Sequence, residues 1–321
     1  MNRILWKKII AVTLLICMMA GMAACGKKGD RVVRIAQTGV YVSATAQIMK
    51  EKGILEKYLP EGVKIEWSEI ATGPDLRDAI VSKRVDIADF SLMTYIAAYE
   101  NDLPLTLLSF SGSTPINIYS NGGEVENLSD FSDASKIAIT NKSTNLHVAF
   151  LAHCAEELGD AMIYDNCLSP IPAADAIASL KTSKDYNGAI FSFPMMVKAE
   201  ENENLLKIAE MTEVINDYSI GDGFVTHSDY LKNNKDIVDA FLKAQDETLQ
   251  FIEENPEEAS QILASLYGVE QTQISSLLES MPPQKKVVGY DKQAQLLYEA
   301  GILAEEPTKF EEIPNYENIP K

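Results

Sequence analysis

Three consecutive polar residues, Lys142, Ser143 and Thr144, precede a stretch with helical periodicity that runs to Leu158. The first turn of a helix presents unpaired N–H groups and a partial positive charge. Hydroxyl groups and an ammonium group beside such a helix start would suit a sulfonate, carboxylate or phosphate. Helix capping uses the same groups, so Ser143 or Thr144 could instead cap the helix while Lys142 is solvated. The segment therefore predicts an anion site or a capped helix start.

Aromatic and acidic side chains lie at other positions where strands are expected to end. Tyr41, Phe90 and Phe193 could stack on a planar ring or pack around alkyl groups. Of these, Phe90 is the one more typical of a core residue. Asp75 and Asp89 could accept hydrogen bonds from an amine or amide, and Asp75 could equally cap a helix. All five are candidates for contact with a small molecule.

The sequence lacks the motifs of common catalytic chemistry. It contains no G-x-S-x-G nucleophile elbow, no H-E-x-x-H zinc motif and no P-loop. His147, His153, Cys154 and Cys167 lie close together in the chain, but their spacing matches no standard zinc pattern. The two cysteines could form a disulfide or remain buried thiols. We therefore expect a protein that is not an enzyme and that holds no cofactor or metal.

The elements that would position these residues alternate between strands and helices. Apolar and β-branched runs predict strands at residues 32–36, 63–67, 85–90, 103–110, 116–119, 136–140 and 189–193. Helical periodicity predicts a mostly helical last third and earlier helices at residues 44–52, 76–84, 92–99, 144–158 and 174–181. Repeated strand–helix–strand units imply mainly parallel sheets with helices on both faces. Two such sets predict an α/β fold with two lobes and a cleft between them.

Ligands of open α/β sheets bind beyond the carboxyl ends of the strands. This rule selects five loops at which the expected strands end. The predicted ligand-binding residues in them are Gly39, Tyr41, Thr72, Asp75, Asp89, Phe90, Ser91, Lys142, Ser143, Thr144, Asn145, Ser192 and Phe193.

The N-terminal segment has the pattern of a secretory signal. A basic start precedes an apolar run from Ile9 to about Ala24. This run of about 16 residues is shorter than the roughly 20 that a spanning helix needs, although an uncleaved membrane anchor is the alternative. We expect residues 1–24 to be a signal peptide and residues 25–30 to be a polar tether.

The rest of the chain is acidic and long enough for two domains of ordinary size. The sequence has 47 Asp and Glu residues against 28 Lys and Arg residues, and its formal net charge is −19. Such a surface repels phosphate backbones, so we expect no nucleic-acid partner.

The end of the predicted signal peptide resembles a bacterial lipobox. It reads Met22-Ala23-Ala24-Cys25, with the small residue before cysteine that lipoprotein signal peptidase requires. Met22 stands where Leu is usual. The resemblance implies that Cys25 becomes an acylated N-terminus, modified with diacylglycerol and palmitate, which anchors the protein outside the bacterial cell membrane.

Further motifs follow one another in an order that is similar to one protein family. They are AQIMKEKGIL (46–55), GPDLRDAI (73–80), VDIA (85–88), NDLPL (101–105), NLSDF (127–131), KST (142–144) and LYEAGIL (297–303). Together they resemble the nitrate, sulfonate, taurine and thiamine-pyrimidine-precursor group of type II periplasmic binding proteins, the NMT1/THI5-like proteins. The resemblance covers nearly all of the chain after the predicted signal peptide.

The chain departs from that group at three places. Lys142 stands where relatives often have glycine, and His147 is displaced by one residue from the usual histidine. The strand that often ends in an aromatic or acidic residue before proline ends here in Phe193-Pro194. These differences concern the ligand more than the fold.

The resemblance implies two lobes joined by two crossings of the chain, near residues 109–112 and 221–224. Residues 31–110 and 224–321 would form the first lobe, and residues 111–223 the second. The lobes would close on the ligand by hinge motion.

The resemblance also implies a monomeric extracytoplasmic substrate-binding protein that serves the permease and ATPase subunits of an ABC importer. Its ligand would be a small sulfonate- or nitrate-like anion or a pyrimidine-like heteroaromatic compound. An extracytoplasmic ligand sensor is the alternative function. An enzyme on the same fold is less favoured, because the relative that makes the thiamine pyrimidine carries a cysteine-rich motif that this sequence lacks.

Overall fold

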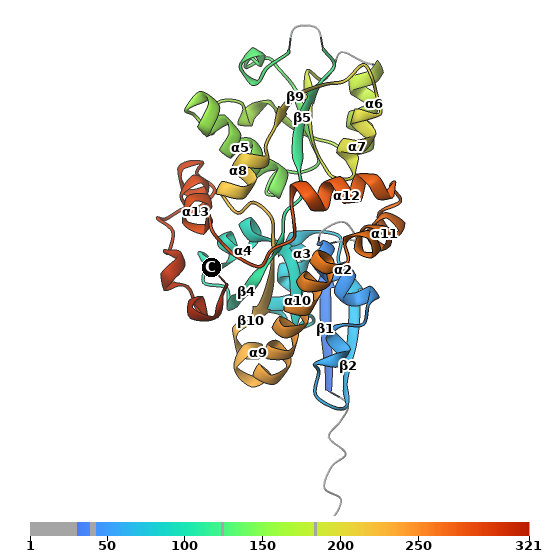
Figure 1. Ribbon diagram of the computed structural model, residues 1–321. Coiled ribbons are helices and arrows are strands. Elements are labelled where there is room, and N and C mark those ends of the chain that lie inside the picture. The colour runs from blue at the N-terminus through green and yellow to red at the C-terminus, as the bar shows by residue number, and fades with distance from the viewer. Residues whose placement is uncertain (1–30, 39–42, 123–124, 183–184, 321) are drawn as a thin grey trace, which may run out of the picture.

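The chain forms two five-stranded sheets, each flanked by helices (Figure 1). The computed structural model describes residues 31–38, 43–122, 125–182 and 185–320. The first sheet has the order β2-β1-β3-β10-β4 and the second β7-β6-β8-β5-β9. The prediction of a two-lobed α/β fold is confirmed.

Each sheet is parallel except for one reversed strand. The strands of the first sheet are β1 (Arg31–Gln37), β2 (Val63–Glu69), β3 (Ile87–Ser91), β4 (Leu105–Gly112) and β10 (Asp222–His227). Those of the second are β5 (Ile116–Ser120), β6 (Ile137–Ile139), β7 (Leu168–Pro170), β8 (Gly188–Ser192) and β9 (Leu206–Glu210). The reversed strands are β10 and β5, which pair antiparallel with both of their neighbours. Each is the first strand that the chain forms after it passes from one sheet to the other.

The helices follow the strands in the expected alternation. Those before the return to the first sheet are α2 (Ala44–Glu51), α3 (Gly73–Val81), α4 (Leu92–Tyr99), α5 (Asn145–Leu158), α6 (Ala173–Thr182), α7 (Met195–Glu200) and α8 (Thr212–Asp217). Those after it are α9 (Ser228–Asn233), α10 (Lys235–Glu254), α11 (Pro256–Tyr267), α12 (Gln271–Ser280) and α13 (Tyr290–Glu299). The described part of the chain contains no helix that is both long enough and apolar enough to cross a membrane.

The two passages between the sheets touch each other. The chain leaves the first sheet after Gly112 and returns to it at Asp222. A Cβ atom on Gly221 would lie 2.2 Å from the carbonyl oxygen of Gly112 and 2.5 Å from the Phe110 ring. Only glycine fits such a close approach. The predicted crossings coincide with these segments, while the assignment of residues to lobes stays a prediction.

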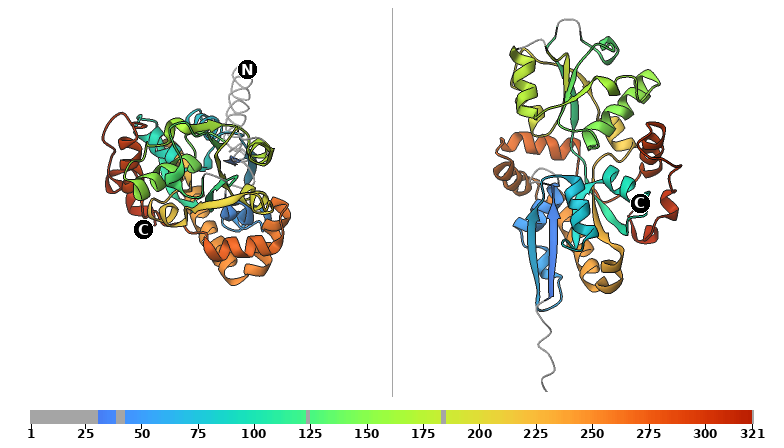
Figure 2. Two further views of the ribbon diagram at one scale, coloured as in Figure 1. Left: turned by 90° about the horizontal axis from the view of Figure 1, so that it is seen from above. Right: turned by 180° about the vertical axis from the view of Figure 1, so that it is seen from behind.

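The C-terminal helices contact both lobes. Helix α12 lies on one side of the junction and α13 on the other (Figures 1 and 2). Helix α13 contacts α4 of the first lobe and α5 of the second. Helix α10 packs against α2 through a buried face that includes Ile237, Phe241 and Ala244, as its periodicity predicts.

Several expectations concern residues that lie outside this description. The signal peptide (1–24), the tether (25–30) and the lipidated Cys25 all fall there. Cys154 and Cys167 are described, and both are buried free thiols, so no disulfide joins them. Burial raises the pKa of the Cys154 thiol to about 12. Within the described residues no group of three His, Cys, Asp or Glu side chains is arranged to hold a metal ion.

Candidate ligand-binding cleft

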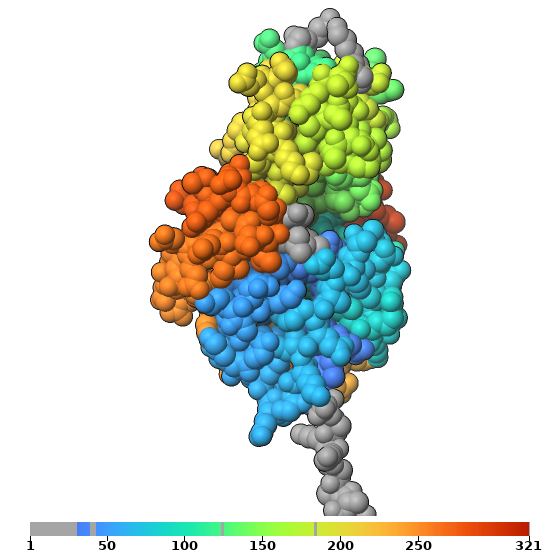
Figure 3. Space-filling model, turned by 90° about the vertical axis from the view of Figure 1, so that its right-hand side faces the viewer, coloured from blue at the N-terminus to red at the C-terminus, as the bar shows by residue number. Residues whose placement is uncertain are grey.

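A cleft of about 560 Å³ lies between the lobes, where strands of both sheets give way to helix starts. Figure 3 shows the second lobe, in green and yellow, above the blue first lobe, with the orange C-terminal helices across one side of their junction. The described lining includes nine hydroxyl-bearing residues, which are Thr38, Thr72, Ser91, Thr94, Thr114, Thr140, Ser143, Thr144 and Ser192. Its other polar residues are Asn141, Lys142, Asn145 and Asp222. The walls are therefore polar, with few charged groups.

The start of α3 forms one wall and has a side-chain cap. Thr72 is the N-cap, and its hydroxyl oxygen accepts the N–H of Asp75 at 3.2 Å. The same hydroxyl donates to Asp75 Oδ2 at 2.7 Å. Thr72, rather than Asp75, thus caps the helix, and proline in the first turn suits this position.

The start of α5 forms the opposite wall and has no side-chain cap. Thr144 occupies the N-cap position, but its hydroxyl donates to the carbonyl oxygen of Asn141 at 2.9 Å. Ser143 has a left-handed backbone with φ of 63°, and its N–H donates to His147 Nδ1 at 3.3 Å. The first-turn N–H groups of α5 are consequently left to other partners.

Lys142 borders the cleft, but its ammonium group is held by Asp165. It donates to the carbonyl oxygen and to Oδ2 of Asp165, both at 2.8 Å. Asp165 Oδ1 lies 2.7 Å from His147 Nε2. The ammonium group is thus in an ion pair rather than solvated, while its contact with a ligand stays a prediction. Nothing in the sequence pattern singles out Asp165, because it lies 23 residues from Lys142.

The pKa values in this network fit the contacts. Burial raises the pKa of Asp165, but hydrogen bonds with Lys142 and His147 outweigh that effect and leave the pKa below its usual range. Burial lowers the pKa of His147 despite the neighbouring carboxylate. A neutral imidazole can accept the Ser143 N–H at Nδ1 and donate to Asp165 from Nε2. The network thereby fixes the backbone that leads into α5.

The first sheet contributes two buried acids to the same region, Asp89 on β3 and Asp222 on β10. Asp222 pairs with Ser91 across the antiparallel strands β10 and β3, and Asp89 lies two residues before Ser91. Both carboxyl groups thus project from one face of the sheet. Asp89 is 1% exposed and Asp222 is 9% exposed. The Ser111 hydroxyl donates to Asp89 Oδ1 at 2.5 Å.

Both acids hold their protons more tightly than usual. Burial raises the pKa of Asp89 to about 6, although hydrogen bonds from Ser111 and Ser43 oppose the shift. Burial and the neighbouring Asp89 together raise the pKa of Asp222 well above its ordinary value, against the effect of Asn145. Asp222 was not among the predicted site residues.

Asn145, the first residue of α5, joins the two walls. The Ser91 hydroxyl donates to its Oδ1 at 2.7 Å. Its Nδ2 donates to Asp222 Oδ1 at 3.2 Å. One amide of the second lobe is therefore bound to two side chains of the first.

Comparison with known proteins agrees with this architecture. Residues 172–259 match the model of the NMT1/THI5 like family. A protein of Bacillus subtilis (strain 168) that is named for the binding of aliphatic sulfonates is 22% identical over 296 residues, which are 89% of this chain and 86% of that protein. The resemblance inferred from the sequence is confirmed.

Two solved structures have a fold that is similar to that of this chain. The periplasmic aliphatic sulphonate binding protein SsuA from Escherichia coli has a TM-score of 0.72 and 18% identity, and covers 90% of this chain and 98% of its own. The alkanesulfonate-binding protein SsuA from Xanthomonas axonopodis pv. citri, bound to MOPS, has a TM-score of 0.69 and 18% identity, and covers 86% and 95%. The fold is that of the periplasmic binding proteins.

The cleft gathers most of the predicted residues. Those that line it are Thr72, Ser91, Lys142, Ser143, Thr144, Asn145, Ser192 and Phe193. Asp75 is exposed beside the start of α3, and Asp89 lies buried behind Asp222. Gly39 and Tyr41 lie outside the described residues. Whether any of them contacts a ligand stays a prediction.

Phe90 lies in the core of the first lobe and not in the cleft. It is fully buried, because alternation along β3 turns it away from the face that carries Asp89 and Ser91. The sequence analysis also missed cleft residues such as Thr94 and Thr114. Thr94 could have been predicted, since it lies one helical turn after Ser91, a predicted site residue, and so faces the same side of the helix.

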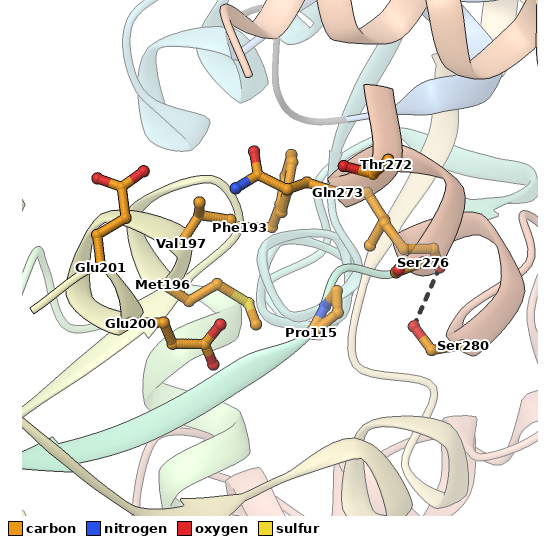
Figure 4. A pocket seen from close by; sticks show the side chains of 11 residues that line it. Pro115, Phe193, Met196, Val197, Glu200, Glu201, Thr272, Gln273, Ser276 and Ser280 are labelled. Atoms are coloured by element: carbon orange, nitrogen blue, oxygen red, sulfur yellow. Dashed lines mark hydrogen bonds between the residues drawn. The ribbon is translucent and has the colours of Figure 1, made fainter. Parts of the chain in front are cut away.

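A second hollow, of about 490 Å³, lies between α7 and α12 (Figure 4). Phe193 borders both this hollow and the cleft. The other residues that Figure 4 shows around it include Met196, Val197, Glu200, Glu201, Gln273 and Ser276. Two carboxylates and several apolar side chains make this hollow a poor site for an anion. It is the alternative location against which anion binding in the cleft can be tested.

Proposed function

We propose that this protein is the extracytoplasmic substrate-binding protein of an ABC importer and captures a small sulfonate-like anion between its lobes. The relatives named for sulfonates support this class of ligand. A binding protein with two lobes would close on the anion and present it to the permease and ATPase subunits.

The uncapped start of α5 carries the proposal. Unpaired N–H groups and the positive end of a helix stabilise an anion without any cationic side chain. The hydroxyl-bearing residues Ser143, Thr140 and Thr72 line the space around it. Lys142 would act indirectly, because its ammonium group is paired with Asp165.

A heteroaromatic ligand fits the described walls less well. Stacking requires aromatic faces, and Phe193 is the only aromatic residue among the described residues that line the cleft. Phe193 also packs against Tyr267, with ring centroids 5.9 Å apart. Hydroxyl and amide side chains are frequent among the other residues that line the cleft, which favours the anion.

The proposal includes attachment to the membrane through Cys25 after removal of residues 1–24. The lipobox-like sequence before Cys25 is its support. If this is correct, Cys25→Ala abolishes the incorporation of labelled palmitate, and undiminished labelling of the variant would contradict it.

The ligand class is tested by calorimetric titration of the purified chain with ethanesulfonate, together with mass spectrometry of small molecules released on denaturation. Ser143→Gly keeps the left-handed backbone and removes the hydroxyl. We expect it to weaken binding about tenfold to a hundredfold, the usual effect of losing one hydrogen bond to a charged group. Ser275→Ala, on the exposed face of α12, is the matched control. Failure of the native chain to bind any sulfonate, with another ligand class released, would contradict the proposal.

A further inference from the structure

Asp222 is an acid in the wall of the cleft, and in its ionised form it would repel an anionic ligand. Asp222 lines the cleft, and no cationic side chain among the described residues acts on it. Lys142, the cation that borders the same space, is held by Asp165. A carboxylate at Asp222 would repel a bound sulfonate at close range in a region with little water.

We propose that Asp222 enters the cleft as a protonated carboxylic acid and donates a hydrogen bond to an oxygen of the bound anion. This inference rests on the proposed function, because it requires that the ligand is an anion. It makes Asp222 a specificity-determining residue that recognises an acceptor oxygen without adding charge.

The geometry of the acid pair supports one shared proton. Asp89 and Asp222 project from the same face of adjacent strands, and both are at least nine-tenths buried. The groups that surround them on β3, β4 and α5 are the neutral side chains of Ser91, Ser111 and Asn145. The neutral hydroxyl of Ser43, just before α2, also hydrogen-bonds to Asp89. Ionising both of two neighbouring carboxyl groups in such surroundings is unfavourable, so one of them keeps its proton to a pH well above the usual range of a carboxyl group.

The hydrogen bonds assign that proton to Asp222. Ser111 donates to Asp89 Oδ1, and a hydrogen bond received from a hydroxyl favours the ionised form. Asp222 receives only the longer contact from Asn145 Nδ2, at 3.2 Å, among the described residues. The pKa values agree, since that of Asp89 is raised to about 6 and that of Asp222 well above its ordinary value.

The Asn145 contact also selects the oxygen that donates. Because Asn145 Nδ2 donates to Oδ1 of Asp222, this oxygen acts as the carbonyl acceptor. The proton then resides on Oδ2, which is left to donate toward the ligand. An asparagine at residue 222 would reproduce both features, since its Oδ1 accepts and its Nδ2 donates.

The proposal fixes the sign of the pH dependence. The binding form carries the proton, so affinity is highest below the pKa of Asp222 and falls as the pH rises through it. An ion pair between a charged Asp222 and a ligand cation would have the opposite sign. Ethanesulfonate is a suitable probe because its sulfonate stays ionised throughout.

The experiment is calorimetric titration of the full chain with ethanesulfonate at a series of pH values, from mildly acidic to the most alkaline at which the chain stays folded. For the native protein we expect affinity to fall at least about tenfold across this range. Asp222→Asn should retain the low-pH affinity and lose the pH dependence. Asp222→Ala should bind at least about fivefold more weakly than Asp222→Asn at every pH. Asp133→Asn, an exposed acid that does not line the cleft, should behave like the native chain.

Asp89→Asn provides a second and independent readout. Removing the neighbouring carboxylate lowers the pKa of Asp222, so the decline in affinity should move to lower pH. Native affinity that is constant or rises with pH would overturn the inference, as would equal losses in Asp222→Asn and Asp222→Ala. If the native chain bound no sulfonate at any pH, the proposed function would fail first, and the inference with it.

Discussion

The charged side chains of the two cleft walls are stabilised in different ways, by ion pairing on one wall and by protonation on the other. On the second lobe, Lys142, His147 and Asp165 neutralise one another and leave backbone N–H groups as the positive surface. On the first lobe, Asp89 and Asp222 have no cationic partner among the described residues, and their pKa values rise instead. The electrostatic potential in the cleft therefore depends on backbone dipoles and on protonation rather than on the formal charges of its side chains.

Removal of Asp165 should be the most damaging change on the second-lobe side. Asp165→Ala leaves the ammonium group of Lys142 and the buried imidazole of His147 without their shared acceptor. We expect a loss of about 2–3 kcal/mol in the free energy of unfolding, the usual effect of breaking a partly buried polar network. Urea denaturation measures it, with the exposed Asp133→Ala as control. A loss below about 0.5 kcal/mol would mean that the network does not order this wall.

On the first-lobe side, the buried carboxyl group of Asp89 should instead make the free energy of unfolding depend on pH. Because the pKa of buried Asp89 is raised to about 6, the folded state binds a proton that the unfolded state releases near pH 4. The native chain should therefore lose stability relative to Asp89→Asn as the pH rises from about 4 to about 7, by about 2–3 kcal/mol. Urea denaturation at several pH values tests this. A difference that does not change with pH would remove the distinction between the walls.

The contacts of Asn145 between the two walls should affect ligand binding more than folding. Asn145→Ala removes the contacts with Ser91 and Asp222 that join the lobes. We expect ethanesulfonate affinity to fall about tenfold, equivalent to about 1.4 kcal/mol, because closure loses two hydrogen bonds. The melting temperature without ligand should change little. A large drop in melting temperature with unchanged affinity would make Asn145 a structural residue only.

The smallest effect is expected at Lys142. Its ammonium group is bound to Asp165, so Lys142→Met should weaken ethanesulfonate binding only about threefold, through the position of the α5 start. Titration calorimetry distinguishes this from direct contact with the anion. A loss of about thirtyfold or more would mean that the ammonium group leaves Asp165 and binds the ligand.

The sequence predicted the fold well because hydrophobic periodicity dictates it. Strands β1 to β6 and β8, and helices α2 to α6, all correspond to predicted segments. The strand β10 was missed, since its opening Asp222-Gly223 resembles a turn rather than a strand. Its role becomes visible only when it pairs between β3 and β4.

The candidate site was predicted less completely, for two physical reasons. Rules about strand ends identify loops, so they found Thr72, Ser91 and the segment 142–145. They do not identify partners brought together by tertiary packing, such as Asp165 beside Lys142 or Asp222 beside Asp89. For Phe90 the signal existed, because strand alternation already separates it from Asp89 and Ser91.

The central claim is that the anion binds at the start of α5. It is tested most directly by recording amide ¹⁵N and ¹H chemical shifts while ethanesulfonate is added to the labelled protein. If the anion binds there, the largest chemical-shift changes occur at the amides of Thr144, Asn145 and Leu146, with smaller changes at Ser91 in the opposite wall. Shifts concentrated at Gln273 and Ser276, in the hollow between α7 and α12, would contradict it (Figure 4).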